Sequence, residues 1–298
     1  MQIRDALKLG IAQLRDANVQ AYTLAAELLL LQAIGKERAW LYAHPEAPVA
    51  TEQQDHFLSL LARRVAGEPV QHLTGHQEFW GLEFEVNSDV LIPRPETEHL
   101  IEVTLDRLGL REVRAGRPQT TGGAGMFLAD VGTGSGCIAV ALAKELPEAN
   151  FYASDISQAA LALAQRNAAR HNLSHRIEFA HNNLLANAKA GNRDPVFFDA
   201  IVSNPPYVGR RESASLEREV RDHEPPEALY GGEEGYELYG ELIAQSAAHL
   251  QSGGLLVLEL GHNSLAAVQP LLAEPAWSYV SVTNDLAGIP RIIAAERS

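Results

Sequence analysis

The feature that most restricts how this chain can fold is a regular alternation of strands and helices from residue 127 onward. Apolar runs of strand length lie at residues 127–131, 151–155, 177–180, 198–203 and 255–260. Helical spacing of apolar residues lies at 137–144, 157–171 and 238–250. Strands that alternate with helices form a mostly parallel, doubly wound sheet, because parallel neighbours need a crossover connection. The sequence therefore predicts an α/β fold with a ligand site at the carboxyl ends of its strands.

The N-terminal part of the chain has a different pattern, that of a small helical bundle. Apolar residues recur at helical spacing over residues 3–15, 22–33 and 38–43, and again from Thr51 to a stop at Gly67. Thr51 is expected to cap that last helix, with Gln54 three residues later. Residues 70–86 contain two glycines and alternating apolar residues, which predicts a β-hairpin.

These patterns predict three parts: a helical bundle over residues 1–70, a β-hairpin linker over 71–92 and an α/β domain over 93–298. Near the start of the last part, Glu96 or Thr97 is expected to open a helix that runs to Leu110. The Gly- and Thr-rich residues 115–125 predict a loop. At the other end, residues 280–283 and 291–295 are expected to pair as a terminal hairpin.

Composition and charge limit the classes of function. The chain has 298 residues and a net charge of −14. Such a surface repels phosphate backbones, so a long nucleic acid is not expected as a partner. The single cysteine, Cys137, excludes an internal disulfide framework. No apolar run reaches membrane-spanning length and the N-terminus lacks a signal-peptide core, so a cytoplasmic protein is expected.

Residues 201–207 (IVSNPPY) run from a strand into a stiff corner. Pro205 and Pro206 have no N–H and fix φ, so the strand must end there. The corner offers two acceptors, the side-chain oxygen of Asn204 and the backbone oxygen of Pro205, which suit the two donors of a planar NH₂ group. The ring of Tyr207 could stack on such a group. A rigid turn that only ends a strand gives the same pattern.

A glycine turn after the first strand of the α/β part favours a nucleoside-containing ligand. Residues 132–136 (GTGSG) let a ligand approach the backbone, and the next helix begins there with free N–H groups. Asp155 lies about twenty residues on, at the end of the second strand, where a carboxylate can accept from both hydroxyls of a ribose. A dinucleotide fingerprint has its third glycine one residue later than Gly136, which weakens an NAD interpretation. A plain strand–helix turn and a helix-capping aspartate are the alternatives.

Taken together, these motifs resemble a known family. Residues 130–136 (DVGTGSG), Asp155 and residues 204–207 (NPPY) resemble class I S-adenosylmethionine-dependent methyltransferases that act on planar amino groups. Upstream, residues 67–75 (GEPVQHLTG) and 91–98 (LIPRPETE) resemble the release factor glutamine methyltransferases, the family called PrmC or HemK. The resemblance covers nearly the whole chain. It implies a Rossmann-like, mostly parallel seven-stranded sheet with a terminal antiparallel hairpin, preceded by a helical bundle.

The resemblance also implies an activity and its residues. The activity is methyl transfer from S-adenosyl-L-methionine to the side-chain amide nitrogen of the glutamine in the Gly-Gly-Gln motif of class I peptide chain release factors. The methionine part of the cofactor would be surrounded by Gly132, Thr133, Gly134, Ser135 and Gly136. The ribose would be held by Asp155, the adenine would be bordered by Asn183 and Leu184, and the entrance would be lined by Arg94, Pro95 and Glu96. The glutamine amide would be held by Asn204, Pro205, Pro206 and Tyr207, with Asn204 also near the cofactor.

Asn183 departs from the family, whose members often have an aspartate at this position. An adenine amino group can donate to an amide oxygen as well as to a carboxylate, although without charge assistance. Cofactor binding is therefore expected to be retained and weakened. The partner implied is the release factor itself, with its body recognised by the bundle and the hairpin of a monomeric enzyme.

Other functions fit parts of the sequence. An amino-methyltransferase acting on adenine or guanine in nucleic acid would share the Asn204 corner, but the net charge and the lack of a basic recognition domain oppose it. A binding module without activity and an NAD-dependent dehydrogenase are two further alternatives. The histidines that suggest a metal are His171, His175 and His181, but no carboxylate or cysteine completes a ligand set, so no metal is expected. Residues 210–230 are polar and form either a substrate lid or a solvated loop.

Overall fold

The computed structural model describes residues 1–109, 123–186, 188–191, 194–273 and 275–298. These residues divide into two compact units. The first unit is Met1–His76 together with Leu216–Glu224, and the second is Gln77–Ser215 together with Pro225–Ser298. The boundary near residue 76 falls inside the segment expected to link two domains, and the return of residues 216–224 to the first unit was not foreseen.

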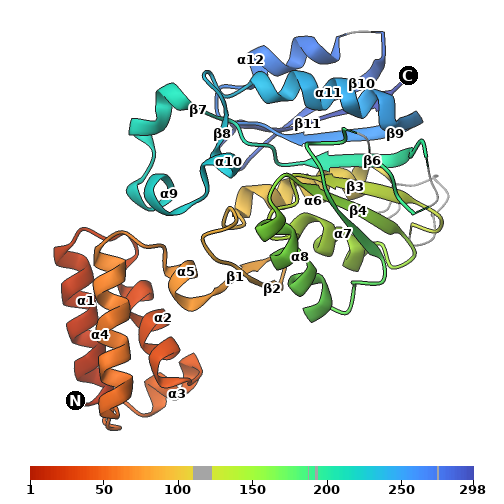
Figure 1. The fold of residues 1–298 in the computed structure, drawn as a ribbon. Helices are drawn as coiled ribbons and strands as arrows, with labels where there is room; N and C mark the ends of the chain where they lie inside the picture. The colour runs from red at the N-terminus through yellow and green to blue at the C-terminus, as the bar shows by residue number, and fades with distance from the viewer. Residues whose placement is uncertain (110–122, 187, 192–193, 274) are drawn as a thin grey trace. The chain divides into compact units, whose positions relative to one another are not determined.

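The first unit is a bundle of helices (Figure 1). They are α1 (Ile3–Asp16), α2 (Tyr22–Ile34), α3 (Arg38–Ala43), α4 (Thr51–Val65), α5 (Val70–Thr74) and α9 (Arg218–His223). Leu14, Leu29 and Phe57 are fully buried between α1, α2 and α4. Gly10 permits the close approach of α1 to α4, because a Cβ there would lie 2.8 Å from Cζ of Phe57. Each large apolar side chain buried in this way stabilises the bundle by about 1.5–3 kcal/mol.

Helix α9 joins this unit from far along the chain. The Arg64 Nη1 atom lies 2.7 Å from Glu219 Oε2, and only 8% of the Arg64 side chain is exposed. A Cβ on Gly67 would lie 3.2 Å from Nε of Arg218. The polar segment 210–230 is therefore divided, because its middle packs with the helical bundle while residues 225–230 belong to the second unit.

A seven-stranded sheet forms the centre of the second unit, in the order β10-β11-β9-β6-β3-β4-β5. Its strands are β3 (Phe127–Val131), β4 (Asn150–Asp155), β5 (Ile177–His181), β6 (Phe198–Ser203), β9 (Leu250–Glu259), β10 (Trp277–Asn284) and β11 (Pro290–Arg297). Strands β9, β6, β3, β4 and β5 are parallel neighbours, and β11 pairs antiparallel with both β9 and β10. The predicted fold class and its terminal hairpin are confirmed.

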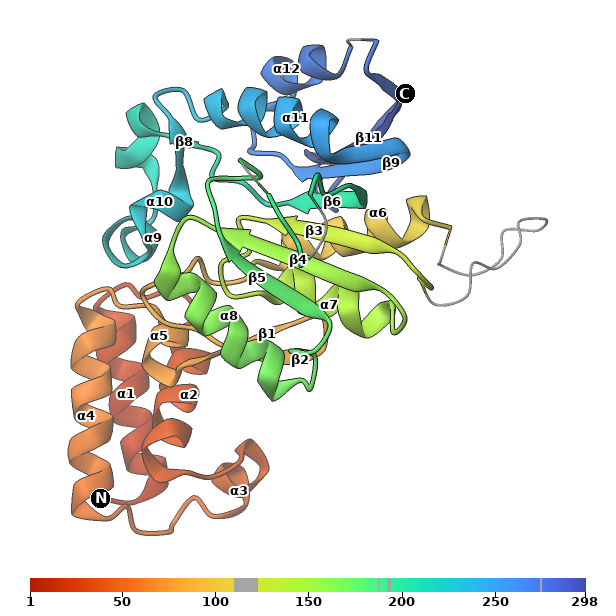
Figure 2. The same ribbon diagram turned by 45° about the vertical axis from the view of Figure 1, so that its right-hand side comes forward.

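Helices cover both faces of this sheet (Figures 1 and 2). One face packs against α6 (Glu98–Arg107), α7 (Cys137–Glu145) and α8 (Gln158–Arg170), and the other against α11 (Glu237–His249) and α12 (Leu265–Val268). Successive residues of a strand serve opposite cores: Val202 and Val257 lie in the first, and Ile201 and Leu256 lie in the second. This double burial explains why the central strands are continuous apolar runs rather than alternating ones.

The remaining elements are short. They are β1 (His76–Phe79), β2 (Leu82–Glu85), η1 (Pro95–Thr97), β7 (Val208–Gly209), η2 (Arg210–Ser215), α10 (Pro226–Leu229), β8 (Tyr230–Gly232) and η3 (Gln269–Leu272). Strands β1 and β2 pair with each other, and β7 pairs with β8 in a small parallel sheet.

Some element boundaries differ from those expected. Thr51 is the first residue of α4 rather than its cap; the cap is Ala50, whose N–H donates to Gln53 Oε1 at 3.2 Å. The hairpin is shorter than predicted because residues 70–74 form α5, which Pro69 precedes and Gly75 ends at φ 78°. Both errors arise because a proline or a glutamine near a helix start can fix the first turn without a hydroxyl cap.

The helix expected from residue 96 or 97 begins as the 3₁₀ turn η1 and continues as α6 from Glu98 to Arg107. Its expected end at Leu110 lies outside the described residues, as does most of the loop expected at 115–125. Within the described part of the chain, no helix has both the length and the apolar character needed to cross a bilayer.

Candidate active site

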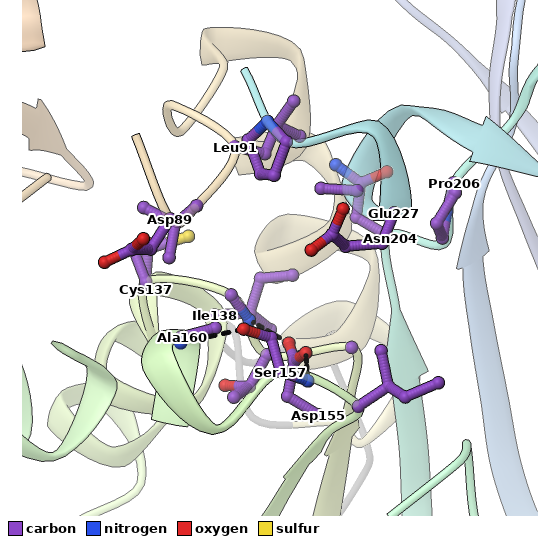
Figure 3. Close-up of a pocket in the computed structure, with 18 of the residues that line it drawn as sticks. Asp89, Leu91, Cys137, Ile138, Asp155, Ser157, Ala160, Asn204, Pro206 and Glu227 are labelled. Atoms are coloured by element: carbon purple, nitrogen blue, oxygen red, sulfur yellow. Dashed lines mark hydrogen bonds between the residues drawn. The ribbon is translucent and has the colours of Figure 1, made fainter. Parts of the chain in front are cut away.

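A cavity of about 310 Å³ opens at the carboxyl ends of β3, β4 and β6, within the second unit. Figure 3 shows Asp155 and Ser157 on one side of it and Asn204, Pro206 and Glu227 on another. This is the edge of a parallel sheet where ligands bind.

The glycine turn after β3 leaves one wall of the cavity open. Gly132 and Gly134 have φ values of 73° and 54°, which favour glycine, and a Cβ on either would meet no atom within 4 Å. Both line the cavity, as do Thr133 and Ser135. Gly136 does not line it but allows the turn to pack on α8, because its Cβ would lie 3.0 Å from Cβ of Ala164.

Asp155 connects this turn to the start of α8. Its Oδ2 accepts from the Gly134 N–H and its Oδ1 accepts from the Ser157 N–H, each at 2.8 Å. Burial raises the pKa of Asp155, while these hydrogen bonds oppose the increase. A carboxylate has about four lone-pair sites, so Asp155 can still accept from a ribose hydroxyl beside these backbone bonds.

Behind the turn lies a second carboxyl group, Asp130, which is fully buried. Its Oδ2 accepts from the Thr133 hydroxyl at 2.6 Å and from the Ala139 N–H at 3.1 Å. Burial raises its pKa to about 7 despite these bonds. Asp130 therefore holds the turn from inside rather than facing a ligand.

Residues 182–184 form the wall next to the end of β4. The Asn182 N–H donates to the Asp155 carbonyl at 3.0 Å, and the Ser154 hydroxyl donates to the Leu184 carbonyl at 2.9 Å. Leu184 has φ 52°, an uncommon value that these contacts hold in place. Asn182, Asn183 and Leu184 all line the cavity, and sequence reasoning had missed Asn182.

The proline corner after β6 forms the opposite wall. Asn204 and Pro206 line the cavity, whereas Pro205 and Tyr207 do not. The Asn204 Nδ2 donates to Thr97 Oγ1 at 3.1 Å. The Asn204 Oδ1 is buried and has no hydrogen-bond partner among the described residues. A buried acceptor without a donor is costly, by about 1–3 kcal/mol, so this atom is suited to a ligand that brings one.

Tyr207 is held back from the cavity by Glu259. Its hydroxyl donates to Glu259 Oε1 at 3.3 Å, and its ring packs where Gly261 leaves room. Glu259 is 1% exposed, and burial raises its pKa to about 7, although Thr97 hydrogen-bonds it and Arg291 attracts its charge. Its Oε2 is buried and makes no hydrogen bond of ordinary geometry within the described residues, which leaves this oxygen open to the hydroxyl of Thr97.

Two glycines that sequence reasoning missed support this corner. A Cβ on Gly231 would lie 2.2 Å from the carbonyl oxygen of Pro206, and one on Gly235 would lie 2.4 Å from that of Tyr207. The β7–β8 pairing brings these segments together. In the sequence, the sign of this support is the glycine pair at residues 231–232. Its cause is not local, because the contacting residue Pro206 lies about 25 residues earlier in the chain.

The three residues expected at the cavity entrance, Arg94, Pro95 and Glu96, do not all line the cavity. Arg94 lines the cavity. Pro95 and Glu96 lie on η1, are exposed and do not line it. Cys137 does line it, but burial raises the pKa of its thiol to about 12, so it is unreactive. Within the described residues, no group of three or more His, Cys, Asp or Glu side chains is placed to hold a metal ion.

An open glycine turn, a carboxylate at the next strand end and an Asn-Pro-Pro corner, on a seven-stranded sheet with a terminal hairpin, define a class I methyltransferase. Two family models match the chain: "PrmC N-terminal domain" over residues 5–75 and "Methyltransferase small domain" over residues 120–220. Solved structures with this fold include a methyltransferase from Pyrococcus furiosus (18% identity, TM-score 0.51, covering 79% of this chain and 96% of that one). Another is the N-terminal domain of human METTL16 in complex with SAH (20% identity, TM-score 0.52, covering 80% and 83%).

Curated relatives specify the family further. The release factor glutamine methyltransferase of Koribacter versatilis is 41% identical over 100% of this chain and 99% of its own length. That of Moorella thermoacetica is 39% identical over the same shares. The chain therefore belongs to the release factor glutamine methyltransferase family, whose members depend on S-adenosylmethionine, and the resemblance seen in the sequence is confirmed.

Proposed function

We propose that this protein methylates the side-chain amide nitrogen of the glutamine in the Gly-Gly-Gln motif of class I peptide chain release factors. The observation that carries the proposal is the buried Oδ1 of Asn204, an acceptor on the cavity wall to which no group in the described part of the chain donates. A primary amide brings two N–H donors and no charge, which suits such a site.

The cavity also fits the cofactor of the family. The backbone of residues 132–135 and the carboxylate of Asp155 would hold its methionine and ribose parts, and Asn183 and Leu184 would border its adenine. S-adenosylmethionine supplies an electrophilic methyl group on a positively charged sulfur.

The task of the protein is to orient the substrate amide. An amide nitrogen is a poor nucleophile because its lone pair is delocalised into the carbonyl. The Asn204 Oδ1 on the cavity wall would accept one of its N–H groups and fix its direction, and good orientation can supply about 7–11 kcal/mol of the barrier. As the nitrogen becomes more positive, this acceptor binds the N–H hydrogen more strongly, so it favours the transition state.

The helical unit would recognise the body of the release factor, so that its Gly-Gly-Gln loop reaches the cavity. A short peptide with the same motif is then a poor substrate. The proposal includes a cytoplasmic, monomeric enzyme with no nucleic-acid substrate.

The test is mass spectrometry of a purified release factor after incubation with the protein and S-adenosylmethionine. One methyl group is expected on the glutamine of the motif, and none on a factor in which that glutamine is replaced by alanine. Parallel incubations with DNA and with ribosomal RNA use tritiated cofactor. Methylation of either nucleic acid, with none on the factor, would replace this proposal by an amino-methyltransferase acting on bases.

A further inference from the structure

The side chain of Asn204 can occupy its site in two ways that differ by a half-turn of its amide. In one, Oδ1 faces the cavity and can accept from a substrate N–H. In the other, Nδ2 faces the cavity and repels the same group, because two donors then meet. The two orientations of the amide have nearly the same shape, so packing alone does not favour either one. A hydrogen-bond partner must determine which orientation is adopted.

Thr97 is that partner, and its own bonds decide which end of Asn204 it takes. The Asn204 Nδ2 donates to Thr97 Oγ1 at 3.1 Å. A threonine hydroxyl has one proton to donate and two lone pairs that accept. If its proton is used elsewhere, Thr97 can only accept from Asn204 and therefore binds only Nδ2.

Glu259 is placed to take that proton. Its carboxylate is 1% exposed at the end of β9, its Oε2 has no other hydrogen-bond partner among the described residues, and the Thr97 side chain lies within reach of it. Above the raised pKa of Glu259 its carboxylate is ionised and can only accept, so the direction of the bond is then fixed. Tyr207, which donates to Oε1 of the same carboxylate, holds it in place.

We infer that Glu259 is a positioning residue: by binding the hydroxyl proton of Thr97, it makes Thr97 accept from Asn204 Nδ2 and so turns Asn204 Oδ1 toward the substrate. The inference rests on the proposed function for the identity of that substrate. It explains why a carboxylate that does not line the cavity is buried behind the corner, at a cost in desolvation.

The variants that test it differ only in hydrogen bonding. Thr97→Val removes the hydroxyl and keeps the shape, Thr97→Ser keeps the hydroxyl, and Glu259→Gln gives a side chain of the same size that can also donate. Thr104→Val is the matched control, because Thr104 is a buried threonine of the neighbouring α6 whose hydroxyl donates to the Leu100 carbonyl.

Release-factor methylation at about pH 8 is the first measurement. The kcat is expected to fall about tenfold or more in Thr97→Val and in Glu259→Gln, with KM for the factor changed less than about threefold. Thr97→Ser and Thr104→Val are expected to stay within about threefold of the wild type. Combining Thr97→Val with Glu259→Gln should add little further loss, because both act through one orientation of Asn204. Fully additive losses, or an unchanged kcat in Thr97→Val, would overturn the inference.

A second measurement needs no substrate. With selective ¹⁵N-asparagine labelling, the side-chain NH₂ signal of Asn204, assigned by its loss in Asn204→Ala, is expected to shift in Thr97→Val and Glu259→Gln but not in Thr104→Val. If the wild type failed to methylate the factor, the proposed function would be wrong while this signal still tested the positioning role. An Asn204 signal unchanged in both variants contradicts that role alone.

Discussion

The two walls of the cavity hold their acceptors in opposite ways. On the cofactor side, Asp155 accepts one backbone N–H at each oxygen and thereby ties the glycine turn to α8. On the substrate side, the Asn204 Nδ2 donates to Thr97, and among the residues that the structure describes its Oδ1 is buried without a donor. The Asp155 carboxylate is already hydrogen-bonded to the backbone, whereas the Asn204 oxygen gains a partner only when a donor arrives.

This difference indicates what each wall contributes. Hydrogen bonds that already exist keep the Asp155 wall in one shape, so the cofactor meets a prepared surface. The unpartnered Oδ1 of Asn204 lowers the stability of the free protein and is satisfied by the reacting group. Binding energy is thereby concentrated where the substrate nitrogen must be held.

The largest effect is expected from Asn204→Ala, which tests the substrate wall directly. The loss of the acceptor is expected to lower kcat by about 100-fold, as the removal of one transition-state hydrogen bond does elsewhere. The affinity for S-adenosylmethionine should change less than about threefold, because the Asp155 wall is untouched. Methylation rates and calorimetry give the two values, and near-normal turnover refutes the role of Asn204.

Gly231→Ala tests whether the corner depends on its glycine support. The new Cβ would lie 2.2 Å from the Pro206 carbonyl, so the corner must shift. Turnover is expected to fall about tenfold or more, because a displacement of about 1 Å is enough to misalign reacting groups. Gly240→Ala is the control: Gly240 lies within α11 with no atom within 4 Å of its Cβ position, and alanine there should be neutral or stabilising by up to about 1 kcal/mol. Equal turnover in the two variants would show that the glycine does not shape the corner.

The same contrast separates what the sequence could predict from what it could not. The order of strands and helices and the Asp155 wall follow from short motifs, because each motif follows the end of a strand and parallel strands bring those ends together. The support from Gly231 and the bonds joining Thr97 and Glu259 to Asn204 connect residues that are far apart in sequence. Helix α9 was missed as a part of the bundle for the same reason, since its contact through Glu219 with Arg64 is set by tertiary packing.

The pH dependence of stability tests whether the two carboxyl groups behind the walls, Glu259 and Asp130, have raised pKa values. The pKa of Glu259 is raised from 4.5 to about 7 and that of Asp130 from 3.8 to about 7, chiefly by burial. Each group therefore holds its proton in the folded state after the unfolded chain has lost it. The stability that they contribute is full below the unfolded pKa values and is lost as the pH rises through the folded ones.

Glu259→Gln should remove the part of the pH dependence of stability that Glu259 contributes. Between about pH 5 and pH 8 the wild type is expected to lose on the order of 2 kcal/mol more stability than the variant. The groups that act on Glu259 are Tyr207, Arg291, Thr97 and Glu96, and all are retained in the variant. Urea unfolding at the two pH values measures the difference, and parallel pH profiles would contradict a raised pKa for Glu259.

The smallest effect is expected from a substitution on the cofactor wall, at Asn183. Asn183 lines the cavity and is exposed, so a charge placed there is partly screened by water. Asn183→Asp is expected to tighten S-adenosylmethionine binding by about threefold, because a carboxylate accepts from the adenine amino group with charge assistance. Attraction between any added negative charge and the sulfonium would also tighten binding, and Asn182→Asp on the same wall measures that contribution. A gain at residue 183 that exceeds the gain at 182 supports the adenine contact, and equal affinities of Asn183→Asp and the wild type by calorimetry remove it.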